Sequence, residues 1–504
     1  MAAAPAALTI GQVSVDLSQP AAAAGLQRPG TAGPHPSPTR RRSALAHPPA
    51  RIWLLVGAAA VLTLGLAAVL TVQISDQQVG LAAIGDQAGP EVVATSDLYF
   101  ALNDMDAQIA NVLLVGEAQN LGFTRTQALD IYEQRRQQVD HDLRQAARNA
   151  ADPASQDAID AVLDTLGQYE AMAAQTILLD QQTSHPAGHP TAAALAQYRQ
   201  TTDLLKNDLL PAAQRLTDQH AQALDATYQT HRAAARSGRN LVLVVGAALV
   251  AVLLALQIYL TRRFRRLLNP AVAAATILAV IGTVLGAGLL SDQAEHLRVA
   301  KKDAFDSVLA LTQARAVSYD ANADESRYLV DPDRAGQYQQ AFLDKSQQLV
   351  TLPGVTLSTW DQDMATAVNA YERDHQAVGW NGYLGTEFRN ITFAGERAQA
   401  ETTLLRYQTY QLDDRRIRAM VAAGQLSDAI AFCTSYAPGA SNYAFDQYDR
   451  ALAALIATNQ HAFDQAVRDG QRELGGKSLA VWLGTVAILA LMVVGVWPRL
   501  REYS

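Results

Sequence analysis

The stretch NLVLVVGAALVAVLLALQIYL at residues 240–260 is apolar, carries no charged side chain and is long enough to cross a membrane as a helix. A bilayer with a hydrocarbon core of ~30 Å needs about 20 helical residues. Three further charge-free stretches meet the same requirement, at residues 52–74, 270–291 and 478–497. A soluble core does not need four such helices, so the sequence predicts a membrane protein with four spans and with the bilayer as a partner.

The composition agrees with this prediction and excludes several classes of protein. Charged residues make up 17% of the 504 residues, well below the ~25% of an average soluble chain. The net charge of −8 argues against nucleic-acid binding. The single cysteine, Cys433, excludes an internal disulfide framework and a cysteine-based metal site.

The arginines predict the orientation of the spans. Short basic segments stay in the cytoplasm, because moving arginine across an energised membrane is unfavourable. The 1–51 segment, the 261–269 loop and the 498–504 tail are basic, and the loop contains Arg262, Arg263, Arg265 and Arg266. We therefore expect both termini inside the cell, two long segments outside it at 75–239 and 292–477, and these four arginines as candidate contacts for a cytoplasmic protein.

Residues 1–51, rich in Ala, Pro and Arg, are expected to form a disordered cytoplasmic tail. A cleaved signal peptide is the competing interpretation of the first span. The segment before the span is longer than a normal n-region, and the apolar run exceeds the ~7–15 residues of a signal peptide, which favours an uncleaved anchor.

Helical periodicity dominates both outer segments. In the first, an apolar stripe with 4-3-4-3 spacing begins at Leu98 and ends at Val112. Asp152-Pro153 starts a helix, and a proline-flanked loop follows residue 183, so we expect four helices at about 76–120, 125–150, 153–183 and 191–238.

The second outer segment divides in a similar way. Asp331-Pro332 ends its first helix, residues 379–395 form a loop, and Pro438-Gly439 precedes its last helix. If Pro353-Gly354 and Gly424 only kink their helices, four rods of on the order of 60 Å result.

The predicted fold is therefore all-α, with four transmembrane helices and two extracytoplasmic four-helix-bundle domains in a duplicated arrangement. The helix that enters the second span has few Gly or Pro residues, which favours rigid coupling between the outer domain and the membrane. For the fourth span, Gly475-Gly476 makes such coupling less secure.

No catalytic motif stands out, and we expect no enzymatic activity, no metal and no cofactor. His185-x3-His189 lies in a proline-flanked loop and is interpreted as solvated imidazoles. Transport is poorly supported, because no span carries the ionisable residue that solute pathways normally need.

Two segments of the second outer domain are candidates for ligand or partner binding. The first is a polar helical stripe with neighbouring charges of both signs, which suits a zwitterion or another protein; its residues are Arg315, Tyr319, Asp320, Asn322, Glu325 and Arg327. The alternative is an ordinary solvated helix face. The second segment, Trp380–Phe393, concentrates aromatic residues and arginine in an expected membrane-distal turn; its candidates are Trp380, Tyr383, Glu387, Arg389 and Asn390. Capping of the bundle's own core is the alternative.

These segments also carry a resemblance. YDANADESRYLV at 319–330, GYLGTEFRNITF at 382–393 and SNYAFD at 441–446 resemble a family of actinobacterial four-span membrane proteins. The best-known relatives are membrane partners of a glutamine-binding lipoprotein and of the cytoplasmic protein kinase G. The resemblance implies a relay that passes an amino-acid signal to a kinase, and it identifies no site residues. The outer domains are also similar in plan to four-helix bacterial sensor domains.

The sequence therefore favours a non-enzymatic signal relay in the cell membrane. Its expected partners are a solute-binding lipoprotein or a small amino-acid ligand outside, and a Ser/Thr kinase or another effector inside. Direct and lipoprotein-mediated sensing both stay open, as does a homodimer. The alternatives are an envelope scaffold or assembly factor, and an accessory transporter subunit.

Overall fold

The computed structural model describes residues 48–118, 121–149, 153–264 and 268–501. Residues 52–504 form one compact unit, and only this unit is considered below. Within the described ranges the secondary structure is helical apart from one isolated antiparallel bridge, Thr351 to Asn381. The all-α prediction is confirmed. The expected disordered tail lies almost entirely outside the described residues.

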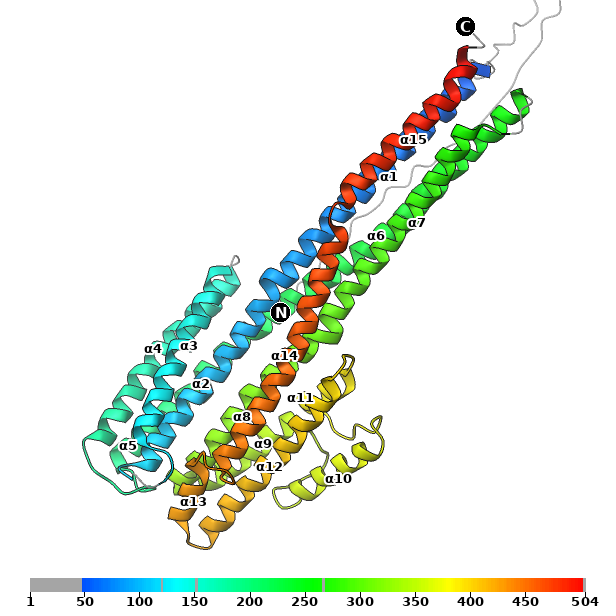
Figure 1. Cartoon of the computed structure of the whole chain (residues 1–504). Helices are drawn as coiled ribbons and strands as arrows, with labels where there is room; N and C mark the ends of the chain where they lie inside the picture. The colour runs from blue at the N-terminus through cyan, green and yellow to red at the C-terminus, as the bar shows by residue number, and fades with distance from the viewer. Residues whose placement is uncertain (1–47, 119–120, 150–152, 265–267, 502–504) are drawn as a thin grey trace, which may run out of the picture. The chain divides into compact units, whose positions relative to one another are not determined.

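Four long helical segments carry the apolar stretches, and each is long and apolar enough to cross a membrane (Figure 1). Three are continuous but contain a π-helical turn. They consist of α1 (Pro48–Ala82), η2 (Ala83–Ala88) and α2 (Gly89–Val115); α5 (Ala192–Leu204), η3 (Leu205–Leu209) and α6 (Leu210–Phe264); and α7 (Pro270–Arg298), η4 (Val299–Phe305) and α8 (Asp306–Val330). The fourth consists of α14 (Ser441–Leu474) and α15 (Lys477–Leu500).

The two connections to the second and fourth spans differ in helical continuity, as the sequence predicts. The segment through α6 continues without a break into the second span, as predicted. Between α14 and α15, Gly476 adopts φ +71°, a left-handed conformation that glycine tolerates and that ends the helical hydrogen-bonding pattern. The fourth span is therefore joined to the outer domain through a bend.

The apolar stretches pack together at one end of the unit. Leu66, Leu249, Ala279 and Ile488, one from each of the four long segments, belong to the same buried cluster. Nearer the outer helices, a second cluster unites the same four segments and includes Leu81, Leu224, Leu297 and Phe463. Four packed helices thus connect the predicted membrane region to the outer domain.

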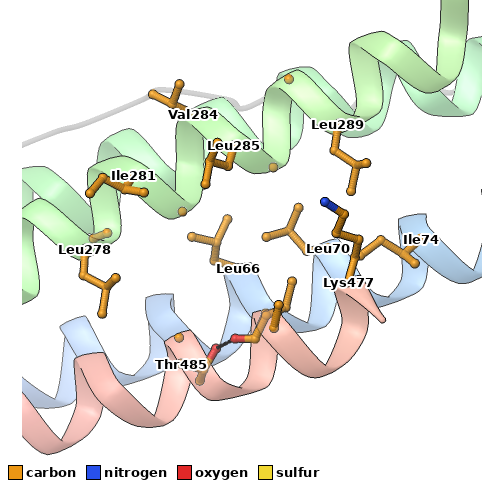
Figure 2. Close-up of a pocket in the computed structure, with 18 of the residues that line it drawn as sticks. Leu66, Leu70, Ile74, Leu278, Ile281, Val284, Leu285, Leu289, Lys477 and Thr485 are labelled. Carbon is orange, nitrogen blue, oxygen red and sulfur yellow. Dashed lines mark hydrogen bonds between the residues drawn. The ribbon is translucent and has the colours of Figure 1, made fainter. Parts of the chain in front are cut away.

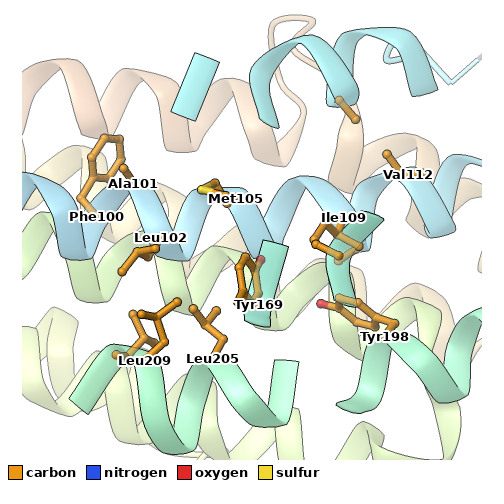
Figure 3. Packing of buried hydrophobic residues seen from close by; sticks show 14 of the residues in the cluster. Phe100, Ala101, Leu102, Met105, Ile109, Val112, Tyr169, Tyr198, Leu205 and Leu209 are labelled. Atoms are coloured by element: carbon orange, nitrogen blue, oxygen red, sulfur yellow. The ribbon is translucent and has the colours of Figure 1, made fainter. Parts of the chain in front are cut away.

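The first outer segment folds as the sequence predicts. It comprises η2–α2, α3 (Arg125–Asn149), α4 (Pro153–Gln181) and α5–η3–α6. The apolar stripe from Leu98 to Val112 is buried, because α2 is enclosed by neighbouring helices on almost every side. Figure 3 shows Leu102, Met105 and Ile109 on the same helix, with Leu205 and Tyr198 across the core.

The second outer segment is more divided than the sequence predicts. It contains α8, η5 (Pro332–Arg334), α9 (Ala335–Leu349), α10 (Trp360–Arg373), α11 (Gly382–Asn390), α12 (Glu396–Ala422), α13 (Leu426–Thr434) and α14. Pro353-Gly354 and Gly424 end helices rather than kink them, since both glycines adopt positive φ. The expected loop at 379–395 contains helix α11. The expectation of four equal rods is wrong.

The two outer segments share one hydrophobic core. Ile109 and Leu205 from the first segment cluster with Leu329, Ile417 and Ile430 from the second. Helices α2 and α8 lie side by side at the centre, where the Ser326 hydroxyl donates a hydrogen bond of 2.8 Å to Asn111 Oδ1. The junction between the segments is therefore an interior region.

Candidate functional site

The central helices bury polar side chains as well as apolar ones. Helix α2 buries Asn103, Asp104, Asp106, Gln108 and Asn111, and helix α8 buries Asp320, Asp324, Glu325, Ser326 and Arg327. Burial of charged groups costs several kcal/mol per ion unless they are paired. The positions of their partners therefore decide how the two outer segments fit together.

Arg327 lies at the centre of this junction with no solvent exposure. Its Nη2 donates to Asp106 Oδ2 at 2.7 Å, which joins α8 to α2. Its Nη1 donates to Asp320 at 2.9 Å and to Asp324 at 2.5 Å, on its own helix. The Tyr198 hydroxyl on α5 donates to Asp106 Oδ2 at 3.1 Å. One guanidinium thus connects three carboxylates from both outer segments.

Two lysines complete this charge cluster. Lys206 in η3 donates to Asp324 Oδ1 at 3.1 Å. Lys345 on α9 lies 2.7 Å from Asp320 Oδ2 and also contacts Asp324. We call Asp106, Lys206, Asp320, Asp324, Arg327 and Lys345 the junction cluster. It contains three cations and three carboxylates, so it can stay ionised inside the protein.

The electrostatics support an ionised cluster. Burial alone would raise the pKa of Asp320, but Lys345, Lys206 and Arg327 outweigh it, and the pKa is lowered. The same balance lowers the pKa of Asp324. Burial and the neighbouring Arg327 charge lower the pKa of Lys206.

A cavity of about 410 Å³ opens beside the junction cluster. The Lys206 side chain, 26% exposed, lines it together with Lys345 and Asp320. The remaining lining residues are Tyr99, Leu210, Pro211, Gln214 and Ala341. The cavity therefore presents two ammonium groups, one carboxylate, a phenol and an amide, which is a set of groups complementary to a small zwitterion or anion.

Both helices that lead from the 261–269 loop contribute to this cavity. Lys206 belongs to the segment that continues through α6 into the second span, and Asp320 belongs to the segment that rises from the third span. Helices α6 and α7 stay in close contact, and a Cβ on Gly246 would lie 2.2 Å from the Thr283 hydroxyl. The cavity is therefore lined by residues of two helical segments that are packed together within the predicted membrane region.

Lys206 also lies within a π-helical turn. Such turns are rare, interrupt the regular α-helical hydrogen bonds and occur frequently at functional sites. Here the turn spans Leu205–Leu209 and ends two residues before Pro211, which has no backbone N–H to donate. The helix is therefore irregular at the point where it lines the cavity.

The structure divides the first group of predicted residues. Asp320 and Arg327 belong to the junction cluster, whereas Arg315 forms a bidentate pair with Asp449 on α14, at 2.6 and 2.9 Å. Tyr319 packs edge-on between Phe100 and Phe445, with ring centroids 4.4 and 4.8 Å away. These two residues hold helices together outside the cavity, and the stripe is not a solvated face.

Asn322 and Glu325 lie apart from the junction cluster and contact α14. Glu325 is buried and accepts a hydrogen bond from the Ser441 hydroxyl at 3.2 Å. Burial, reinforced by Asp414, raises the pKa of Glu325 well above its usual range. Asn322 makes long contacts of 3.5 Å to Glu325 and Asn442. Neither residue lines the cavity.

The second predicted group does not form a membrane-distal turn. Asn390 Nδ2 donates to the carbonyls of Lys302 and Asp303, at 2.9 and 3.0 Å, and these residues lie only three helical turns beyond the third span. The membrane-distal end is instead built where Gly122 approaches Ser435. The predicted position is wrong because α8 already carries the chain to the distal end. Helix α9 then returns the chain alongside α8, with Lys345 against Asp320, so that α11 lies near the membrane, and α12 runs outward again.

Most residues of this second group pack inside the protein or hold buried segments in place. Trp380 is 2% exposed and belongs to the core, and Arg389 donates to the Trp380 carbonyl at 2.7 Å. Tyr383 is partly buried near α8 and lies outside the cavity lining. The alternative interpretation, capping of the bundle's own core, therefore describes Trp380 and Arg389.

Glu387, also predicted as a site residue, is buried and lies beside Glu396. Burial raises the pKa of Glu387 to about 8, and the neighbouring Glu396 carboxylate adds to this effect. Glu396 itself accepts hydrogen bonds from the backbone N–H groups of Thr392 and Phe393, at 2.7 and 2.8 Å. Burial and Glu396 together therefore favour the protonated form of Glu387.

The loop arginines are only partly described. Arg262 and Arg263 are exposed at the end of α6, whereas Arg265 and Arg266 lie outside the described residues. His185, expected to be solvated, is buried, and its Nε2 lies 2.7 Å from Asp180. Within the described ranges, no group of three or more His, Cys, Asp or Glu side chains is arranged to hold a metal ion.

Sequence reasoning missed the cavity residues Lys206, Lys345 and Tyr99, and the cluster residue Asp106. One signal was available, because the chain has only five lysines and two of them line the cavity. Asp106 stands next to the apolar stripe of α2, where it reads as a solvated residue. Only the packing of α8 against α2 shows that it faces a buried arginine.

Comparison with known proteins adds one finding. Residues 80–229 match the family described as "Actinobacterial sensor domain". The match covers less than a third of the chain and extends from the last turn of α1 into α6, so it includes Asp106 and Lys206. The comparison with curated proteins and that with solved structures found no significant match. The similarity to a sensor domain and the four apolar helices together support a multi-pass membrane protein of the sensor class.

Proposed function

We propose that this protein senses a small extracytoplasmic ligand in the junction cavity and passes the signal through its spans to a cytoplasmic effector. The observation that carries the proposal is the cavity itself, where Lys206 and Asp320 meet. Each belongs to a continuous helix that contains a predicted span. Ligand binding and the position of the spans are thereby coupled through the same two helices.

A free amino acid is the ligand class that suits the cavity best. Its carboxylate would pair with the ammonium groups of Lys206 and Lys345, and its ammonium group would pair with Asp320. Such charge-assisted hydrogen bonds are the strong ones in proteins. The ligand would compete with Asp324 for Lys206 and so loosen a contact of 3.1 Å between the two span-bearing helices.

The competition between the ligand and Asp324 for Lys206 explains how binding in the cavity would affect the distant spans. A ligand shifts a conformational equilibrium by as much as its affinity differs between the two states. If the bound state weakens the Lys206–Asp324 pair, the helices through α6 and α7 can move relative to each other. With both termini in the cytoplasm, the 261–269 loop would carry the change to a partner such as a Ser/Thr kinase.

Titration calorimetry on the full-length protein in detergent tests the proposal. Aspartate, glutamate and glutamine are each titrated into the wild type and into Lys345→Gln. We expect binding to the wild type that weakens by about tenfold or more in the variant, since a hydrogen bond to a charged group is lost. Lys302→Gln is the matched control, because Lys302 pairs with Asp306 outside the cavity.

The same experiment addresses a lipoprotein route. If free amino acids give no heat but an amino-acid-loaded solute-binding lipoprotein does, the direct-binding proposal is wrong and the protein reads its partner instead. If neither gives heat while circular dichroism shows a folded protein, the sensor proposal fails. An envelope scaffold then becomes the better interpretation.

A further inference from the structure

The predicted membrane region contains a cavity that the sensor proposal does not use. It measures about 600 Å³ and lies between α1, α7 and α15 (Figure 2). Leu66 and Leu70 of α1 face Leu285 of α7 across it. Its wall is apolar along most of its length, and an apolar cavity does not hold water.

The cavity has the depth of one membrane leaflet. Along α1 it extends from Thr63 to Ile74, which is about 16 Å at ~1.5 Å per residue. The hydrocarbon core is ~30 Å thick, so this is about half of it. The other half of the span region is closed, because Ile52, Leu256 and Val496 pack there in a buried cluster.

Three charged residues line the end of the cavity nearest the outer domain. Lys477 extends from the start of α15 toward α7, as Figure 2 shows, and it makes no ion pair within the described ranges. Asp292 of α7 and Glu473 of α14 lie at the same end. Glu473 also pairs with His296 at 3.3 Å. A cation and two carboxylates therefore surround the opening of an apolar groove.

We infer that this groove binds one acyl chain of a glycerophospholipid whose head group carries a primary ammonium. The apolar length accommodates the chain from a single leaflet. The lipid phosphate would pair with Lys477, and the head-group ammonium would donate hydrogen bonds to Asp292 and Glu473. A trimethylated head group cannot donate these bonds, and a head group without a cation would face two carboxylates. The inference rests on the membrane assignment alone and is independent of the amino-acid site.

The glycines of the groove provide a direct test. A Cβ on Gly484 of α15 would meet no atom within 4 Å, so a larger side chain can enter the groove from there. Gly57 of α1 is equally unobstructed but lies outside the groove. Gly484→Leu should fill the binding space, and Gly57→Leu is the matched control for adding a leucine to a span.

Native mass spectrometry of the full-length protein in detergent measures lipid binding. Phosphatidylethanolamine, phosphatidylcholine and phosphatidylglycerol with identical acyl chains are titrated. We expect phosphatidylethanolamine to bind most tightly, by about tenfold for the extra charge-assisted hydrogen bonds. Gly484→Leu should abolish this binding while Gly57→Leu retains it, and Asp292→Asn should reduce the preference over phosphatidylcholine.

Three outcomes would overturn the inference. One is equal binding of all three lipids by the wild type. Another is unchanged phosphatidylethanolamine binding in Gly484→Leu, with circular dichroism showing intact helices. The third is a wild-type dimer that becomes a monomer only in Gly484→Leu, which would assign the groove to a second copy of the chain.

Discussion

The junction cluster makes a quantitative prediction about Arg327. Replacement by methionine keeps much of the side-chain volume but removes the cation that contacts Asp106, Asp320 and Asp324. Lys206 and Lys345 stay near two of these carboxylates, so the main loss falls on Asp106. In the variant, Asp106 would keep only hydrogen bonds from neutral hydroxyl groups.

The expected cost follows from the burial of both partners. The side chains of Arg327 and Asp106 have 0% exposure, so neither charge can turn toward water. Removal of one member of a buried ion pair typically costs about 3–5 kcal/mol. We expect Arg327→Met to lower the free energy of unfolding by that amount. Asp106→Asn should cost less, about 1–3 kcal/mol, because Arg327 keeps its two carboxylates on α8.

The double variant separates a specific contact from general damage. If the 2.7 Å contact carries the stability, Arg327→Met with Asp106→Asn should cost less than the sum of the single changes, by about 1–3 kcal/mol. Chemical denaturation of the full-length protein in detergent, followed by circular dichroism, measures each free energy. Arg136→Met is the control, since its pair with Glu133 is solvent-exposed and should contribute under about 1 kcal/mol.

Two results would refute this reasoning. If the free energy of unfolding of Arg327→Met lies within about 0.5 kcal/mol of the wild-type value, the arginine is not a buried partner of three carboxylates. If the two changes add within about 0.5 kcal/mol, α2 and α8 are not joined through this contact.

Three further predictions follow from the outer domain and the spans. Glu387 has an ordinary pKa of 4.5 and a folded-state pKa of about 8, so between these values the folded protein holds a proton that the unfolded chain releases. Stability should therefore fall as the pH rises through this window, and Glu387→Gln should remove that component in denaturation measured from pH 4.5 to 8. In the same assay, Gly476→Ala should lower the free energy of unfolding by about 1 kcal/mol, because alanine is strained at φ +71°. An unchanged free energy of unfolding would mean that the bend is absent. An impermeant maleimide should label Gln425→Cys in intact cells and should label Arg262→Cys only after lysis. Native Cys433 is buried and should stay unlabelled. The reverse labelling pattern would show that the proposed topology is wrong.

Much of the fold could be predicted from the sequence, because it depends on local properties. A charge-free stretch of about 20 residues has few alternatives to a membrane helix, and the stretch at 240–260 shows this most clearly. The start of α4 at Pro153 and the break at Gly475-Gly476 follow from the backbone preferences of proline and glycine. These properties require no knowledge of distant residues.

The candidate site could not be predicted in the same way, because it depends on which helices meet. Asp106 and Arg327 are separated by 221 residues, and each looks like part of a solvated helix face in the sequence. Lys345 lies on α9, which follows a turn after α8. Lys206 lies in a π-helical turn, and no local sequence pattern predicts that turn. Burial turns these ordinary charges into a paired cluster, and burial is a property of the tertiary structure alone.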